Sequence, residues 1–358
     1  MSDFIDDLCK QVELAARNKT QLRPLGGGTK NFYGGPLQGE EVDMRQWAGI
    51  VEYEPTELVI TVKPGTALAE VEAALAAEKQ ELAFEPPRLG AKGTIGGAIV
   101  SGLAGPARLS KGGVKDYVLG CTLLDGKGQL LHFGGVVMKN VAGYDVARVI
   151  PGSMGTLGIA TELSIKVMPV APAEATLQFD MDVNKAIAQS NEWLSKPLPI
   201  SATFFDNGKL TVRLRGASAA VQAATKNMGG QEMESQQAQA FWTSVRDQQH
   251  AFFKAEGDLW RMAVPPTTVD LAMHGQSVHE WGSGLRWLRA DAGVTAEQIR
   301  ATAKRVGGHA TLYRTGNDAA RVHAFQQPDA VMLKLQRRLK EQFDPAGVFS
   351  INRLSPIL

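Results

Sequence analysis

The glycines of this chain are concentrated toward one end, and this uneven distribution restricts the possible folds more than any other feature. Of the 38 glycines, 25 lie in residues 1–158, and 17 of these 25 lie in residues 90–158. Glycine has no Cβ atom and adopts positive φ angles at no steric cost, so clusters of it permit tight turns and close approach to the backbone. We therefore expect the first part of the chain to contain loops whose backbone makes the important contacts.

Composition excludes several classes of protein. The chain has 358 residues, with 38 Lys and Arg against 37 Asp and Glu and 44% hydrophobic residues, which is typical of a globular protein. This length predicts about two domains. A formal net charge of +1 argues against nucleic-acid binding through a broad positive surface, so small molecules or proteins are the expected partners.

Cysteine content and hydropathy predict the cellular environment. Cys9 and Cys121 are too few for a disulfide framework or a cysteine-rich zinc site. The first residues are acidic, and the longest weakly polar stretch, residues 94–105, is far shorter than the roughly 20 residues that span a bilayer. We expect a cytoplasmic protein without a transmembrane helix.

Up to about residue 170, strand and helix patterns alternate with glycine-rich turns. Residues 4–19 carry apolar side chains at helical spacing, and residues 117–124 and 129–133 flank an Asp-Gly pair, which indicates a hairpin. Further strands are predicted at residues 21–25, 58–62 and 158–167, and a further helix at residues 67–77. Residues 86–113 are rich in Gly and Pro without periodicity, which predicts a long ordered loop or several tight turns.

The composition changes after a predicted domain boundary at residues 169–172, because glycine becomes sparse and glutamine clusters appear. The helices predicted beyond this boundary are residues 183–195, 217–228, 235–248 and 329–343. The strands predicted there are residues 201–205, 209–214, 260–264, 284–289 and 310–314. Strands and helices that do not alternate strictly indicate the α+β class. We therefore predict one domain in residues 1–170 and an α+β domain in residues 171–358.

The first candidate binding motif is RPLGGGTKN, residues 23–31. Three consecutive glycines allow successive backbone N–H groups to converge on an anion such as phosphate, and the Thr29 hydroxyl and Lys30 charge add to this site. The motif contains neither GxxxxGK[ST] nor GxGxxG, so it is not a P-loop or a dinucleotide-binding fingerprint. Taken alone, it is equally compatible with a tight turn of no binding function.

Two further clusters have the same character. GTIGGA, residues 93–98, precedes Ser101 and Gly102, and GSMGTLGI, residues 152–159, leads directly into a predicted strand. Small residues let another chemical group lie against the backbone, and each cluster also carries hydroxyl groups. Each could instead be a packing turn, but three such clusters in one domain favour a shared binding site.

In order and spacing, five segments between about residues 18 and 170 resemble the FAD-binding domain of the vanillyl-alcohol oxidase / p-cresol methylhydroxylase superfamily. These segments are RPLGGGTK, TIGG, VKDYVLGCTLLDGKGQL, KNVAGYD and GSMGTLGI. The short length and the closing FDPAGVFSINRL further resemble the FAD-binding subunits of bacterial glycolate oxidases. The resemblance implies a two-part FAD-binding domain and a smaller α+β cap domain, with the C-terminal tail returning to the FAD domain.

The resemblance also implies which residues contact FAD. In chain order these are Pro24, Gly26, Gly27, Gly28, Thr29, Lys30, Pro86, Thr94, Ile95, Gly96, Gly97, Ser101, Gly102, Gly152, Ser153, Gly155, Thr156, Gly158 and Ile159. Some relatives attach the flavin through His or Cys in these loops, but residues 26–31 and 86–113 contain neither, so non-covalent FAD is expected. Cys121 and His132 lie on predicted hairpin strands, where a core or surface role is favoured over attachment.

The second domain departs from the family pattern. Related D-lactate and glycolate dehydrogenases carry a metal-binding motif, H-x-G-D-G-N-x-H, which this chain lacks, since His274 and His279 have no such residues between them. No metal is therefore expected. In HATLYR, residues 309–314, His309 and Tyr313 lie on one face of a predicted strand and are candidate proton acceptors, but a purely structural strand is favoured over this role.

The resemblance implies a subunit of a complex that oxidises glycolate, or a similar 2-hydroxy acid, to glyoxylate. Electrons would pass from FAD to an iron-sulfur subunit, and a homologous larger FAD subunit would be the other partner. Alternatively, this chain is a flavin relay or assembly subunit, and the larger subunit oxidises the substrate. Membrane contact is expected to be peripheral at most, through the complex at the inner face. The basic run KLQRRLK, residues 334–340, is either a solvated helix face or a minor contact with anionic lipid.

Overall fold

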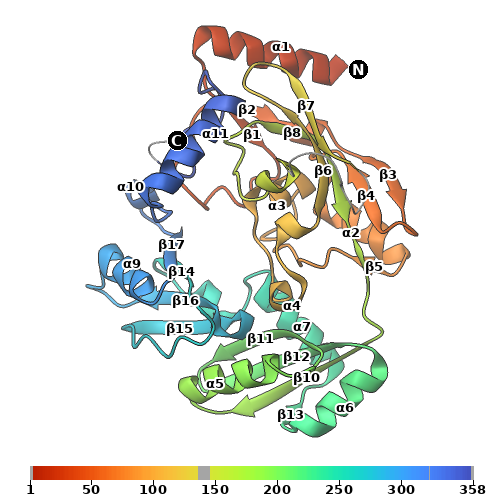
Figure 1. Ribbon diagram of the computed structural model, residues 1–358, viewed down its shortest axis with the longest axis vertical. Helices are drawn as coiled ribbons and strands as arrows, with labels where there is room; N and C mark the ends of the chain where they lie inside the picture. The colour runs from red at the N-terminus through yellow and green to blue at the C-terminus, as the bar shows by residue number, and fades with distance from the viewer. Residues whose placement is uncertain (1–2, 136–145, 322, 356–358) are drawn as a thin grey trace.

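The computed structural model describes residues 3–135, 146–321 and 323–355, and Figure 1 shows two lobes. The first lobe, residues 3–135 with 146–169, is coloured red to yellow and surrounds a five-stranded sheet. The second lobe, residues 173–321, is green to blue and surrounds an eight-stranded sheet. Helices combined with mostly antiparallel strands confirm the predicted α+β class. The motif KNVAGYD, residues 139–145, lies outside the described residues.

The five-stranded sheet forms the core of the first lobe. Its strands, in spatial order, are β3 (Ile50–Glu54), β4 (Val59–Val62), β8 (Ile159–Lys166), β6 (Val118–Leu124) and β7 (Leu130–Gly134). Every residue of β4 is buried, and Thr61 and Ser164 pair their hydroxyls at 3.0 Å inside the sheet. Helices α2 (Leu68–Ala77) and α3 (Ile95–Ser101) contribute apolar side chains to the same core. The sheet and its two helices therefore form one packed core that carries the loops at its edge.

A small two-stranded parallel sheet near the beginning of the chain also contacts the end of the chain. Strand β1 (Leu22–Leu25) pairs with β2 (Glu40–Asp43), and α1 (Asp3–Asn18) packs against them through its apolar face. The N–H of Leu22 donates to the carbonyl of Val348 at 2.7 Å, and the N–H of Ser350 donates to the carbonyl of Leu22 at 3.1 Å. After α11 (Ala330–Phe343), the final segment thus lies along β1 in the first lobe (Figure 1).

The second lobe is a single antiparallel sheet covered by helices. Its strands, in spatial order, are β13 (Gln231–Glu232), β10 (Ala173–Asp180), β12 (Lys209–Gly216), β11 (Ile200–Asp206), β15 (Gly275–Glu280), β16 (Leu285–Ala290), β14 (Leu259–Ala263) and β17 (His309–Arg314). Helices α5 (Val183–Leu194), α6 (Ser218–Met228) and α9 (Ala296–Arg305) pack on it in two apolar clusters. A third cluster, which includes Trp287 and Tyr313, contacts Tyr33 and Leu103 of the first lobe.

The remaining elements are short, except α7 (Ser235–Arg246), which packs beside the sheet. They are η1 (Met44–Gln46), β5 (Gln80–Glu81), α4 (Arg108–Lys111), η2 (Val114–Asp116), η3 (Val146–Val149), β9 (Met168–Pro169), α8 (Ala251–Lys254), η4 (Trp281–Ser283) and α10 (Asp318–Arg321). Within the described residues, no helix is both long enough and apolar enough to cross a membrane.

The structure differs from the sequence prediction mainly in half-exposed or glycine-rich elements. Residues 95–101, predicted as loop, form helix α3, which the Thr94 hydroxyl caps by accepting from the N–H of Gly97 at 3.2 Å. Strands β2, β3, β10 and β15 were not predicted, because their exposed residues interrupt the apolar alternation that identifies a strand.

Candidate cofactor site

The loop after β1 has no room for side chains. An added Cβ atom at Gly27 would lie 1.5 Å from the carbonyl oxygen of Lys92, and one at Gly26 would lie 2.4 Å from the Thr94 hydroxyl. Gly28 has φ +69°, a conformation that favours glycine. The three glycines therefore let this loop pack directly against the segment that leads into α3.

The backbone of this loop offers hydrogen-bond donors. The N–H of Asn31 donates to the carbonyl of Gly28 and closes a turn. Among the residues that the structure describes, nothing accepts a hydrogen bond from the N–H groups of residues 26–30. Because unpaired backbone donors are costly unless water or a ligand satisfies them, the loop is suited to holding an anion.

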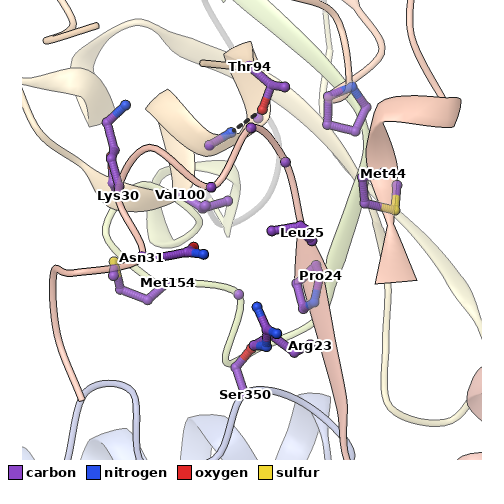
Figure 2. A pocket seen from close by; sticks show the side chains of 18 of the residues that line it. Arg23, Pro24, Leu25, Lys30, Asn31, Met44, Thr94, Val100, Met154 and Ser350 are labelled. Atoms are coloured by element: carbon purple, nitrogen blue, oxygen red, sulfur yellow. Dashed lines mark hydrogen bonds between the residues drawn. The ribbon is translucent and has the colours of Figure 1, made fainter. Parts of the chain in front are cut away.

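Residues 26–30 line a cleft with about 900 Å³ of free space, part of it open to solvent (Figure 2). Thirteen of the residues predicted to contact FAD line it: Pro24, Gly26, Gly27, Gly28, Thr29, Lys30, Thr94, Gly96, Gly97, Ser101, Gly155, Gly158 and Ile159. The three glycine clusters, which are far apart in the sequence, thus meet in one place. No Asp, Glu, His or Cys is found among the described residues of the cleft wall.

Six residues predicted to contact FAD do not line the cleft. Ile95 points into the core of the first lobe, and Pro86 is buried in the loop before α3. Gly102 ends α3 with φ +65° and lies against Gly152, where an added Cβ would approach the Gly152 nitrogen to 2.9 Å. The last two of the six, Ser153 and Thr156, form a separate turn. In this turn the Thr156 hydroxyl donates to the carbonyl of Ser153 at 2.7 Å.

Cationic side chains surround the cleft. Burial lowers the pKa of Lys30 to about 8, although the charge of Asp247 acts in the opposite direction. Burial, together with Arg321 and Arg23 nearby, lowers the pKa of Arg353 to about 10. Arg353 donates to the carbonyls of Tyr33 and Gly35. A bound anion would offset the cost of burying these positive charges.

Sequence reasoning missed two cleft residues that come from the end of the chain. Ser350 and Arg353 line the cleft because the final segment lies along β1. Asp344 holds that segment in place by accepting from the N–H groups of Val348 and Phe349, both at 2.8 Å. The motif FDPAGVFSINRL was the available signal, but it did not indicate which of its side chains reach the cleft.

The candidate proton acceptors lie in the second lobe, outside the cleft. His309 is at the exposed start of β17. Tyr313 is fully buried, its hydroxyl accepts from the side-chain amide of Gln248 at 3.0 Å, and burial raises its pKa. Neither residue lines the cleft, although Tyr313 borders a second cavity between the lobes.

The other histidines of this lobe give no indication of a metal site. Across the described ranges, no group of three or more His, Cys, Asp or Glu side chains could hold a metal ion. His279 is buried, and its burial, with the charge of Arg286, lowers its pKa to about 3. A neutral, buried histidine beside an arginine is explained by packing in the sheet.

Comparisons with known proteins identify the family. Residues 4–134 match the model of an FAD binding domain. Glycolate oxidase subunit GlcE of Escherichia coli (strain K12) is 41% identical over 352 residues, which cover 98% of this chain and 97% of that protein. The chain belongs to this family of glycolate oxidase subunits. Its cofactor is FAD.

More distant relatives are similar in sequence over only part of the chain, or are similar in fold alone. Glycolate oxidase subunit GlcD of Bacillus subtilis (strain 168) is 32% identical over 213 residues, which cover 58% of this chain and 45% of that protein. The structure of xylooligosaccharide oxidase from Myceliophthora thermophila C1 superimposes with a TM-score of 0.65 at 15% sequence identity. The match covers 99% of this chain and 90% of the chain of that oxidase. The predicted FAD-binding domain and the resemblance to glycolate oxidase subunits are therefore confirmed, and the structural similarity extends the FAD-binding fold over nearly the whole chain.

The cleft fits FAD on chemical grounds. FAD contains an anionic diphosphate, which requires converging donors, and a flat ring system, which requires neighbours without bulky side chains. The N–H groups of residues 26–30 and the charges of Lys30 and Arg353 meet the first requirement. The glycines at positions 96, 97, 155 and 158 meet the second.

Proposed function

We propose that this chain is the FAD-binding subunit of a complex that oxidises glycolate to glyoxylate. The observation that carries the proposal is the cleft itself, where three glycine clusters, unpaired N–H groups and cationic side chains meet in a chain of the glycolate oxidase subunit family. When bound, FAD supplies the capacity to accept a hydride and to release electrons one at a time. The division into domains at about residue 170 and the cytoplasmic location stay predictions.

Each part of the cleft has a role in holding FAD. The loop of residues 26–30 binds the diphosphate through its N–H groups, and Lys30 contributes a positive charge from a largely buried position. Thr94 keeps the first turn of α3 in place beside the loop through its bond to Gly97. Binding is non-covalent, since the described cleft wall holds no His or Cys to which a flavin could be attached.

Partner subunits complete the reaction. An iron-sulfur centre needs several cysteine ligands, and the two cysteines of this chain lie far from one another in sequence, so a partner subunit supplies that centre. A larger homologous subunit, of the kind named GlcD among the relatives, is the second partner.

A second candidate is a flavin relay or assembly subunit whose larger partner oxidises the substrate. It is favoured by the absence of the motif H-x-G-D-G-N-x-H from the sequence. His279 lies on β15, in a hairpin with β16 whose sequence is VHEWGSGLRW. A buried Glu280 and Trp287 occupy this hairpin.

The two candidates differ in whether this chain's own flavin is reduced by substrate. We expect stopped-flow mixing of the purified, FAD-loaded chain with glycolate or D-lactate to bleach the visible flavin band if this chain oxidises the substrate itself. If the flavin stays oxidised until the partner subunits are added, the relay function is supported. Failure of the purified chain to retain any FAD would contradict both.

A further inference from the structure

Helix α11 carries three exposed apolar side chains close together, at the outer edge of the first lobe in the view of Figure 1. Val331 is 71% exposed, Met332 47% and Leu335 53%, and residues three or four apart are neighbours on a helix. The other large apolar side chains that are exposed within the described residues lie singly on separate parts of the chain. Scattered apolar residues are normal on a protein surface, whereas a contiguous group marks a binding surface. We call these three residues the α11 patch.

The patch continues an apolar stripe that the first lobe covers only in part. Val331, Leu335, Leu339 and Phe343 stand at every fourth position of α11 and form this stripe. Phe343 is buried and Leu339 packs against the core of the first lobe, so the C-terminal half of the stripe has its partner within this chain. The N-terminal half remains in water, where apolar surface is unfavourable. A second surface that covers this half would stabilise it.

Three cations border the α11 patch. Lys334, Arg337 and Arg338 are exposed, and none of them forms a hydrogen bond or an ion pair with any residue that the structure describes. Lys334 is three residues from Val331, and Arg338 is three residues from Leu335, so both lie beside the patch. An apolar centre with a charged rim is the usual composition of a protein interface, and Met and Arg are enriched there. The matching surface would be apolar and edged by carboxylates.

This charge distribution favours a different protein over a second copy or a membrane. A two-fold contact between copies of this chain would bring the same three cations together, and like charges repel. Amphipathic helices that bind lipid commonly insert Trp, Phe or Leu side chains. The only aromatic side chain of α11, Phe343, is buried instead. A protein with acidic groups around an apolar groove fits both the patch and its cations.

Helix α11 is fastened to the wall of the cofactor cleft. The Nζ atom of Lys340 donates to the carbonyl of Thr156 at 2.6 Å and to that of Phe349 at 2.9 Å. Gly155 and Ser350, which are adjacent to these two residues in sequence, line the cleft. A protein that docks on α11 therefore lies close to the cofactor. This is the position that a partner needs if it exchanges electrons with the flavin.

We propose that the exposed face of α11 is the docking surface for the larger homologous subunit of the complex. The α11 patch enters an apolar groove of that subunit, and carboxylates at the edge of the groove pair with the three cations. The choice of this partner rests on the proposed function, whereas the association itself requires neither turnover nor flavin reduction.

The test is equilibrium binding of the full-length, FAD-loaded chain to the purified larger subunit from the same organism, measured by calorimetry and sedimentation velocity. We expect Leu335→Glu to weaken binding by at least about tenfold, because a charge replaces the apolar centre of the interface. Leu14→Glu is the matched control, since Leu14 is a leucine of α1 that is 57% exposed, and it should bind as the unmodified chain does. FAD content and melting temperature confirm that each variant is folded, and Leu335→Ala, with a smaller loss, replaces Leu335→Glu if that variant does not fold.

A second comparison examines the cations. Binding of the unmodified chain should weaken between about 50 and about 300 mM NaCl, because salt screens exposed charges. Arg338→Glu should bind more weakly and depend less on salt, whereas Arg305→Glu, at an exposed position on α9, should behave as the unmodified chain does.

The inference is overturned if the larger subunit does not bind, or if Leu335→Glu binds it as tightly as the Leu14→Glu control. It is also overturned if Leu335→Glu leaves that affinity unchanged but abolishes self-association, or abolishes binding to vesicles of phosphatidylglycerol and phosphatidylethanolamine. Because subunit binding is measured without substrate, a positive result stands even if glycolate fails to bleach the flavin. A negative result leaves the role of the cleft in holding FAD intact, so the two proposals can fail separately.

Discussion

A lysine buried at the edge of the cofactor cleft determines how FAD binding depends on pH. Burial lowers the pKa of Lys30 to about 8, because its positive charge is removed from water and Asp247 compensates only partly. Below this pH the apoprotein holds a charged amine beside the unpaired N–H groups of the glycine loop. The diphosphate of FAD stabilises that charged form.

We therefore expect the affinity for FAD to fall as the pH rises above about 8, because binding then requires Lys30 to take up a proton. Measurement of the FAD dissociation constant by flavin fluorescence between about pH 7 and about pH 9.5 would show the decrease in affinity. Lys30→Met should bind FAD more weakly at neutral pH and show less pH dependence. Lys304→Met, on the exposed side of α9, should behave as the unmodified chain, and an equal pH dependence in Lys30→Met would contradict this explanation.

At the scale of elements, the cleft depends on close contacts between backbones. Helix α3 contains Gly96 and Gly97, although glycine inside a helix costs about 0.5–1 kcal/mol relative to alanine. An added Cβ at Gly96 would lie 2.6 Å from the side chain of Pro64, and one at Gly27 would overlap the carbonyl of Lys92. The glycines thus lower the local stability of the helix but allow the backbones of three segments to approach one another closely.

Gly27→Ala should therefore displace the loop of residues 26–30 from the segment before α3. We expect the purified variant to retain much less FAD than the unmodified chain and to melt at a lower temperature, because backbone atoms cannot yield to a contact of 1.5 Å. Gly316→Ala is the matched control, since an added Cβ there meets nothing within 4 Å. Full FAD content in Gly27→Ala, measured by absorbance after gel filtration, would show that the loop is not the diphosphate site.

On the scale of the whole molecule, partly buried ion pairs join the two lobes. Glu85 of the first lobe contacts Arg213 of β12 at 2.8 Å, and its other oxygen accepts from the N–H of Ala107 at 2.7 Å. Glu81 pairs with Arg215 at 2.9 Å. Together with the shared aromatic cluster, these contacts set the position of the second sheet relative to the cleft.

Removal of the charge at Glu85 should destabilise this junction. Glu85→Gln leaves Arg213, whose side chain is 6% exposed, without its carboxylate, and losing one partner of a buried pair typically costs about 3–5 kcal/mol. We expect a lower free energy of unfolding in urea, whereas Glu57→Gln, at an exposed position, should change it little. A value for Glu85→Gln equal to that of the Glu57→Gln control would mean that the pair does not stabilise the junction.

How much could be predicted from the sequence depended on how local each feature is. The glycine loop at residues 26–28, the hairpin of β6 and β7, and the long strand β8 were recognisable because their signals lie within a few consecutive residues. Helix α3 was missed because its glycines concealed the helical pattern.

The amino-acid sequence alone determined the α+β class, the FAD-binding character and most of the cleft residues, since glycine clusters act through their own backbone. Only the tertiary structure decided that Arg353 reaches the cleft and that Lys30 is buried there. These side chains come from distant parts of the chain. Their burial, its effect on their pKa values and the absence of hydrogen-bond partners for some of their atoms arise only when the folded chain brings these side chains together.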